Sequence, residues 1–282
     1  MYYLANYHCH THFSDGKQSI DQYVKRALQN NMQAIGFSDH APVQLDCNWT
    51  MPLVKLPDYL SQIKEAKLTY QGQINVFTSL EVDYIPGLIS LETDYIQAAQ
   101  LDYTIGSVHF VDFLPNGEPW CIDCTTKVFE EGLAQIFMGD VKTAVSRYYE
   151  LIREMIEQTR PDIVGHVDRI RKCNIRNAFW NEKEDWYREQ VMLTLQTIAD
   201  NNCIMEINTK GFYRKWEDDA YPRLWIVEEA LKMGIPVHAA SDAHHPKYLI
   251  GGFDFVHDNL KKAGCEASMH FDGNSWIGKP LA

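Results

Sequence analysis

Histidine and acidic residues recur in this sequence directly after short runs of apolar or β-branched residues. His8 and His10 form the first pair, and residues two apart in an extended strand point to the same side, so both imidazoles can reach one metal ion. Further candidate ligands at the ends of later runs are Asp15, His40, Glu81, His109, His166, Asp242 and His244. Imidazole and carboxylate ligands suit Zn, Fe, Mn or Co. Nine such ligands exceed the needs of one ion, so the sequence predicts a site for several.

The elements that must gather these side chains are strands separated by helices. Seven runs predict strands, at Tyr3–Cys9, Ala34–Ser38, Asn75–Asp83, Asp102–Val108, Asp162–Gly165, Cys203–Asn208 and Ile235–Ser241. Segments with helical spacing lie between them, and strands connected in this way pair in parallel. We therefore predict an α/β fold, a closed or nearly closed (β/α) barrel in which the ligands share the carboxyl-terminal rim of the strands. A weaker run at Ala267–Phe271 leaves open whether seven or eight strands close the barrel, and we expect one domain over residues 1–282.

Composition narrows the classes of function. The 38 acidic residues against 26 basic ones give a formal charge of -12, which argues against nonspecific binding to nucleic acid or to an anionic membrane. No apolar run approaches the roughly 18 residues of a membrane span, and the first residues lack the pattern of a secretory signal. Seven cysteines without a framework spacing fit a reduced compartment, so we expect a cytoplasmic protein with free thiols. Cys121 and Cys124 form an isolated C-x-x-C, which we interpret as structural or incidental.

The ligand order resembles that of the PHP (polymerase and histidinol phosphatase) superfamily of metal-dependent phosphoesterases. The resemblance rests on the segments 8–11, 14–16, 38–40 and 242–244 together with Glu81, His109 and His166. It implies a distorted seven-stranded (β/α) barrel, similar to a TIM barrel, with up to three divalent ions, Zn, Fe or Mn, at its rim. One ion would bind His8, His10, Glu81 and Asp242, a second Asp15, His40 and His244, and a third Glu81, His109 and His166. Asp15 stands where some members of the family have histidine.

Three further phrases, at residues 79–84, 105–110 and 206–209, look like the histidinol-phosphate phosphatase branch of this family. The resemblance implies an enzyme of histidine biosynthesis that hydrolyses L-histidinol phosphate by direct attack of a metal-activated hydroxide on phosphorus. Another small phosphorylated substrate, a nucleotide or a phosphosugar, remains the main alternative. A polymerase-associated PHP domain is disfavoured because no polymerase region or basic stripe accompanies the barrel.

Several residues are candidates for contact with the substrate. Arg169, three residues after His166, is the best protein ligand for phosphate because a guanidinium fork matches phosphate oxygens. Lys210 and Arg214 are further candidates, although the branch tends to have a small polar residue at position 210. Ser107 could hydrogen-bond either the ligands or the phosphate. His245 is a candidate general acid for the leaving alkoxide, and with Arg169 it completes the predicted catalytic set.

Other positions are predicted to shape the site. Asp39 and Asp168 are candidates for orienting neighbouring imidazoles. The segment Phe110–Gly139 is long for a connection between a strand and a helix, so it is a candidate lid or substrate wall. Aromatic candidates for recognising the leaving group are Tyr84, Phe110, Phe113, Trp120 and Phe212.

Overall fold

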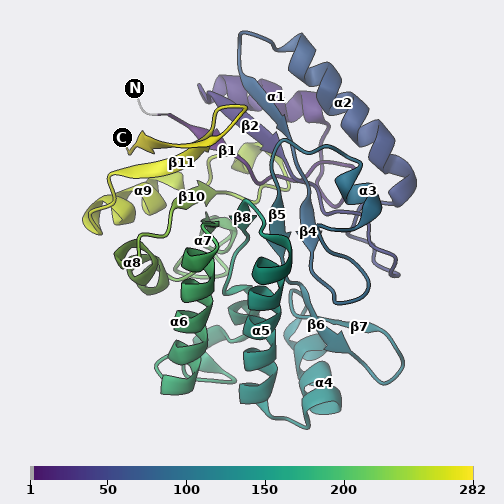
Figure 1. Cartoon of the computed structure of the whole chain (residues 1–282), viewed down its shortest axis with the longest axis vertical. Coiled ribbons are helices and arrows are strands. Elements are labelled where there is room, and N and C mark those ends of the chain that lie inside the picture. Colours follow the sequence, from purple (N-terminus) through teal and green to yellow (C-terminus); the bar gives the residue numbers. More distant parts are fainter. Residues whose placement is uncertain (1–2, 282) are drawn as a thin grey trace.

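A computed structural model describes residues 3–281. Eight short strands build a barrel in two parallel sheets (Figure 1). The first sheet contains β1 (Ala5–Asn6), β2 (Ala34–Phe37) and β3 (Asn75–Thr78). The second contains, in spatial order, β10 (Val237–Ala240), β9 (Ile204–Asn208), β8 (Ile163–Val164), β5 (Ile105–Ser107) and β4 (Glu81–Asp83). Within the described residues, no helix is long and apolar enough to cross a membrane.

Two isolated bridges join these sheets into a ring. His40 bridges to Glu81, which connects the end of β2 to β4, and Cys9 bridges to Ala243, which connects the ends of β1 and β10. The run predicted as one strand over Asn75–Asp83 is broken at Ser79–Leu80 into β3 and β4. Counting β3 and β4 as one stave, seven staves surround the core, as the sequence predicts for a distorted (β/α) barrel.

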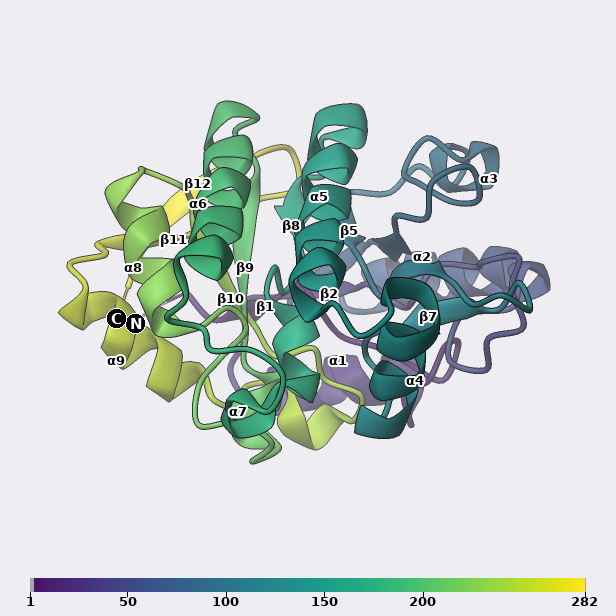
Figure 2. The ribbon, with the colours of Figure 1, turned by 90° about the horizontal axis from the view of Figure 1, so that it is seen from below.

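Helices cover the outside of the ring (Figure 2). Their bounds are α1 Ile20–Gln29, α2 Leu56–Thr69, α3 Asp94–Gln97, α5 Val141–Thr159, α6 Asp185–Asp200, α7 Lys210–Tyr213, α8 Leu224–Lys232 and α9 Phe253–Lys262. A capping box formed by Ser19 and Gln22 begins α1, and the Asp140 side chain accepts a hydrogen bond at the start of α5. These caps satisfy amide groups that have no partner inside the helix. The buried faces of both helices therefore pack on the barrel at fixed positions.

The run at Ala267–Phe271 does form a strand, but it is not an eighth stave. This strand, β11, pairs antiparallel with β12 (Trp276–Pro280). The hairpin packs against the barrel interior near its amino-terminal end, where the Tyr7 hydroxyl donates to the carbonyl of Phe271 and accepts from its amide. It therefore closes the end of the barrel opposite the rim that carries the ligand candidates.

The long segment after β5 is structured rather than a simple loop. It contains the antiparallel hairpin of β6 (Phe110–Phe113) and β7 (Pro119–Cys121), followed by α4 (Thr126–Phe137). Trp120 is fully buried and packs so tightly on Gly132 that a β-carbon there would lie 2.0 Å from the indole. This packing fixes the hairpin against α4 and makes the segment a rigid wall beside the rim.

Candidate metal centre

The structure brings the nine predicted ligands together at the carboxyl-terminal rim of the strands. Possible ligand atoms fall into four groups. One of them, His40, Asp83 and His109, includes Asp83, which was not among the predicted ligands. The other three are His10, Asp15, His40 and His244; His8, His10 and Asp242; and Glu81, His109 and His166. We call these the outer, middle and inner clusters. Asp15 and His244 are half-buried, while the other seven side chains are buried. These three groups are similar to the ligand sets implied by the family resemblance, with two differences: Glu81 is absent from the middle cluster, and His10 also joins the outer cluster.

Glu81 lies between the clusters. Its Oε2 is 2.9 Å from His40 Nδ1 and 3.3 Å from His8 Nε2, while its Oε1 is 3.0 Å from His166 Nε2. The Ser107 hydroxyl donates to Oε1 over 2.7 Å. Glu81 is therefore positioned to bridge two ions, and Ser107 orients it rather than facing the pocket.

The outer cluster faces solvent. Asp15 Oδ2 lies 3.0 Å from His244 Nε2, and Lys210 Nζ lies 3.2 Å from the same nitrogen and 3.1 Å from Asp242 Oδ1. Asp242 has a left-handed backbone with φ of 48°, a conformation that is uncommon for residues other than glycine. This backbone turns Asp242 and His244 toward clusters that begin on β1, at the opposite end of the chain.

Two carboxylates that were not among the predicted site residues orient the imidazoles. Glu206 Oε1 is 2.5 Å from His8 Nδ1, and Asp83 Oδ1 is 2.9 Å from His109 Nδ1. Each contact directs the other ring nitrogen, Nε2, into the clusters, which is how outer carboxylates commonly fix a metal-binding histidine. A sequence signal existed for Glu206, because a charged residue inside an otherwise apolar strand requires a buried partner.

Asp39 and Asp168 do not have the predicted role of orienting imidazoles. Asp39 accepts hydrogen bonds from the backbone amides and hydroxyls of Thr11 and Ser14, and so fixes the loop that carries Asp15. Asp168 accepts from Arg171 Nε and from the Arg223 amide, away from the clusters. Both are buried carboxylates that follow strands, and the sequence pattern alone does not separate such residues from those that touch a ligand.

The electrostatics of the clusters fit bound cations. Burial alone would raise the pKa of Glu81, but the surrounding imidazoles, His8 foremost, hold it well below its usual range. Burial, with His244 and His40 nearby, lowers the pKa of His10 well below its ordinary value, so its ring is neutral. Against the effect of burial, Glu206 raises the pKa of His8, Glu81 raises that of His40, and Asp83 raises that of His109 to about 9. Metals bind neutral imidazoles and ionised carboxylates, so an ion at the clusters would displace protons from these three rings. His109 Nε2 and His166 Nε2 face each other across 3.3 Å beside Glu81, a convergence of donor atoms that an ion between them would satisfy.

A pocket of about 410 Å³ opens over the outer and inner clusters. Three of the predicted substrate residues line it: Arg169, Lys210 and Arg214. The aromatic candidates named from the sequence do not; the aromatic lining comes instead from Trp49 and Trp216. Trp49 packs edge-on against His40, with ring centroids 4.5 Å apart. Asp123 from the segment after β7 also lines the pocket, so that the predicted wall does border the site.

Arg169 is the most distinctive residue of this lining. Its side chain is 1% exposed, its Nη2 donates to both oxygens of Asp123 over 2.9 Å, and its guanidinium lies over the Tyr221 ring. Nε and Nη1 are buried without a hydrogen-bond partner. Buried donors of this kind are costly unless a ligand satisfies them. Arg169 is therefore held in place on one side and available to an anion on the other.

The structure does not bring His245 to the pocket lining. It lies at the start of the 3₁₀ turn at Pro246–Tyr248, where its Nδ1 accepts a hydrogen bond from the amide of Lys247. A general acid must reach the leaving oxygen directly or through one water. The geometry thus gives His245 a capping role and offers no support for proton transfer.

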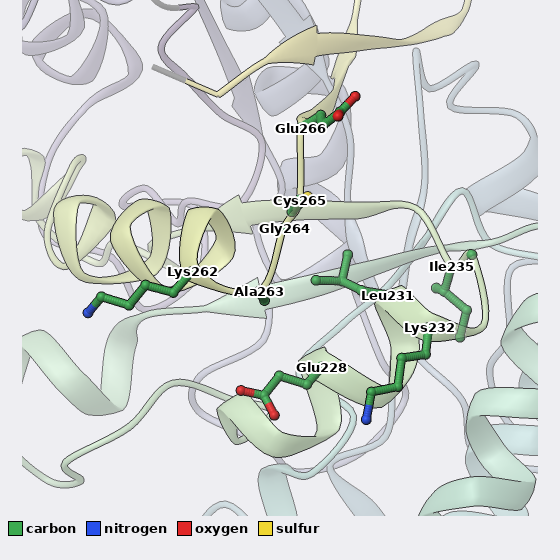
Figure 3. Close-up of a pocket in the computed structure, with 10 residues that line it drawn as sticks. Glu228, Leu231, Lys232, Ile235, Lys262, Ala263, Gly264, Cys265 and Glu266 are labelled. Carbon is green, nitrogen blue, oxygen red and sulfur yellow. The ribbon is translucent and has the colours of Figure 1, made fainter.

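A larger groove lies elsewhere, between the ends of α8 and α9 (Figure 3). It is lined by Leu231, Lys232, Lys262 and Cys265 among others. Among the described residues, its lining contains none of the groups of possible metal ligands. Its size therefore does not make it the reactive site, and the smaller pocket over the clusters remains the candidate.

Comparisons with known proteins identify the family of this chain. A family model described as PHP domain matches residues 6–210, which include seven of the nine predicted ligands. Histidinol-phosphatase of Bacillus subtilis (strain 168) is 28% identical over 252 residues, covering 84% of this chain and 92% of the relative. Histidinol-phosphatase of Lactococcus lactis subsp. lactis is 23% identical over 277 residues, covering 95% of this chain and 94% of the relative.

A solved structure shares the fold of this chain. The crystal structure of histidinol phosphate phosphatase from Lactococcus lactis, complexed with Zn, L-histidinol and phosphate, matches with a TM-score of 0.72 and 18% identity. The match covers 97% of this chain and 98% of that one. The family model spans well over half of the sequence, and the barrel with its rim of buried imidazoles and carboxylates has the matching architecture. The chain belongs to the PHP family.

Proposed function

We propose that this PHP-family phosphoesterase hydrolyses L-histidinol phosphate to L-histidinol and inorganic phosphate. The observation that carries the proposal is Arg169, whose buried Nε and Nη1 have no partner and whose side chain lines the pocket beside the clusters. Free guanidinium N–H groups are strong donors to phosphate oxygens. The named activities of the B. subtilis and L. lactis relatives support the choice of substrate.

We further propose that the three clusters bind three divalent ions, drawn from Zn, Fe and Mn. When bound, such ions supply a nucleophilic water of lowered pKa and neutralise charge on the phosphoryl group. The protein residues would divide the remaining work. Glu81 holds the clusters together, Arg169 binds and orients the phosphate, and Lys210, 3.1 Å from Asp242, adds a positive charge at the edge of the pocket.

The pocket can hold a substrate of this size. Its volume of about 410 Å³ lies within the ordinary range of small-molecule sites. The Trp49 ring, which stacks on Phe110 at 5.5 Å, offers an apolar face near the inner cluster for the imidazole of the substrate. The seven cysteines, all free in the structure, support a reducing, cytoplasmic location for the reaction.

A specific feature of the pocket favours a second candidate, another small phosphorylated substrate such as a phosphosugar or a nucleotide. Five basic residues line the pocket: Lys17, Lys172, Arg169, Lys210 and Arg214. The two carboxylates of the described lining are already engaged, Asp15 with His244 and Asp123 with Arg169 and Lys172. The ammonium group of histidinol phosphate therefore has no free carboxylate partner in this lining, whereas a neutral or anionic leaving group needs none.

Initial rates of phosphate release decide between the two candidates. Metal-loaded protein would be assayed with L-histidinol phosphate, phosphosugars and nucleoside monophosphates at equal concentrations. We expect kcat/KM for histidinol phosphate to reach about 10⁴ M⁻¹s⁻¹ and to exceed the others by tenfold or more. A higher value for a phosphosugar or a nucleotide would overturn the first candidate and support the second.

A further inference from the structure

Cys121 and Cys124 form a pair at the wall of the pocket. Cys121 is the last residue of β7, and Cys124 directly precedes Thr125, whose side chain caps the start of α4. Both residues line the pocket that contains Arg169 and the outer cluster. Cys121 is buried, whereas Cys124 is partly exposed. The C-x-x-C read from the sequence as structural or incidental thus places two thiols together beside the candidate active site.

The two thiols differ in exposure and interact with each other. They hydrogen-bond to each other, which raises the pKa of Cys121 well above its usual range and lowers the pKa of Cys124. Lys172, which also donates to the Asp123 carbonyl between the two cysteines, favours the lower value at Cys124. The thiolate is the reactive form of cysteine. The more accessible thiol, Cys124, is therefore the one that a dissolved oxidant meets first, and a second thiol lies beside it.

The turn between the cysteines also holds Arg169. Asp123 lies between them, and both of its carboxylate oxygens accept hydrogen bonds from Arg169 Nη2. Lys172 Nζ donates to the Asp123 carbonyl over 2.8 Å and to its carboxylate. Any covalent link between Cys121 and Cys124 closes this turn into a small ring. Asp123 lies inside that ring, so its contacts with Arg169 depend on the shape of the turn.

We propose that Cys121 and Cys124 are a thiol modification site that peroxides convert to a disulfide, and that this bond weakens phosphate binding by displacing Asp123 and Arg169. The Cys124 thiolate attacks the peroxide O–O bond, which forms a sulfenic acid and releases water after proton transfer. The Cys121 thiol then attacks the sulfenic sulfur, which forms the S–S bond and releases a second water. Two thiols are oxidised and one peroxide is reduced. The effect on activity rests on the proposed function, whereas the bond and its effect on phosphate affinity do not.

The first arm of the test detects the bond. The full chain, loaded with zinc because zinc has no redox chemistry of its own, is treated with hydrogen peroxide. We expect peptide mass spectrometry to show a disulfide between Cys121 and Cys124 that a thiol reductant removes. In Cys121→Ser the sulfenic acid on Cys124 should persist and react with a sulfenate-trapping reagent. Cys265→Ser is a matched control, since Cys265 is partly exposed but lies in the remote groove, and it should form the same disulfide.

The second arm measures the affinity for inorganic phosphate by calorimetry, together with kcat/KM where a substrate is known. We expect peroxide to weaken both by about tenfold, reversibly, in the natural sequence and in Cys265→Ser but not in Cys121→Ser. Absence of the disulfide peptide, or a disulfide that leaves phosphate affinity unchanged, would overturn the proposal. Equal losses in Cys121→Ser would also overturn it, because the damage would then lie elsewhere. Failure of every substrate, with the phosphate effect intact, would count against the proposed function alone.

Discussion

Replacing Glu206 by glutamine tests whether a strand that supplies no predicted ligand nevertheless sets the affinity for metal. Glu206 is fully buried and accepts from three donors: His8 Nδ1 at 2.5 Å, the His166 amide at 2.8 Å and Asn208 Nδ2 at 3.2 Å. Asn208 in turn donates to Asp242 over 3.2 Å. This one carboxylate therefore contacts the predicted ligands His8 and His166 directly and is linked to a third, Asp242, through Asn208.

The size of the effect follows from the number of acceptors lost. A glutamine side chain has one acceptor oxygen, so an amide hydrogen must face either His8 Nδ1 or the pair formed by the His166 amide and Asn208. In the first orientation the proton of His8 is pushed onto Nε2, the nitrogen that points at the middle cluster. In the second orientation, the N–H groups of the glutamine side chain face the N–H donors of the His166 amide and Asn208, and no hydrogen bond forms. Loss of such an outer partner typically weakens metal binding 10- to 100-fold, which corresponds to about 1.4 to 2.7 kcal/mol.

The assay is competition for Zn²⁺ between the metal-free protein and a chromophoric chelator, with bound metal counted by elemental analysis. Asp168→Asn is the matched control, because Asp168 is equally buried but contacts Arg171 and Arg223 rather than a predicted ligand. We expect this control to lower the stability of the metal-free protein without lowering its zinc affinity. Unchanged zinc affinity in Glu206→Gln, or an equal decrease in both variants, would refute the positioning role.

Three further results are expected. Arg169→Lys should raise KM by about tenfold with a smaller change in kcat, since lysine lacks the fork; steady-state kinetics check this against Arg188→Lys on the exposed surface of α6. When zinc is present at 100 times its Kd, removing it with a chelator should lower the free energy of unfolding by about 2.7 kcal/mol. Calorimetry measures this change, and an unchanged unfolding transition would mean that the clusters bind no ion. Burial lowers the pKa of His270 from 6.5 to about 4, so the unfolded chain binds the extra proton and stability is lost as the pH falls below 6.5. Between pH 8 and pH 5 this loss is about 2 kcal/mol, and denaturation of His270→Gln should show a correspondingly smaller decrease.

The sequence predicted the ring of strands and the place of the clusters because both depend on a local pattern. Each candidate ligand follows an apolar run, and parallel strands bring such positions to one rim. The orienting contacts of Glu206 and Asp83 depend instead on which strands become neighbours and on the rotation of each imidazole. The spacing of residues along the sequence reveals neither which strands are neighbours nor how each imidazole is rotated.

The lining of the pocket was harder to predict for the same reason. Trp49 lies in an irregular segment between β2 and α2, and Trp216 follows the short helix α7. Such segments have no periodicity that indicates where a side chain points. The break between β3 and β4 was also missed, because apolar or β-branched residues stand at every second position from 76 to 82, as in one continuous strand. The hydrogen bonds of β3 to β2 and of β4 to β5 determine the break, and these partners are distant in sequence.

The β-bridge between Cys9 and Ala243, which closes the ring of strands, has a consequence for how the protein is synthesised. His8 and His10 leave the ribosome early, but Asp242 and His244, which share clusters with them, follow more than two hundred residues later. Until that last stave is synthesised, an incomplete chain carries an open edge of backbone at β1 and several ligands that can bind metal without the correct partners. Contacts so distant in sequence form slowly. A metal ion that binds the growing chain too early would therefore find only the ligands made first, such as His8 and His10. Correct binding of metal must wait until the ring of strands has closed.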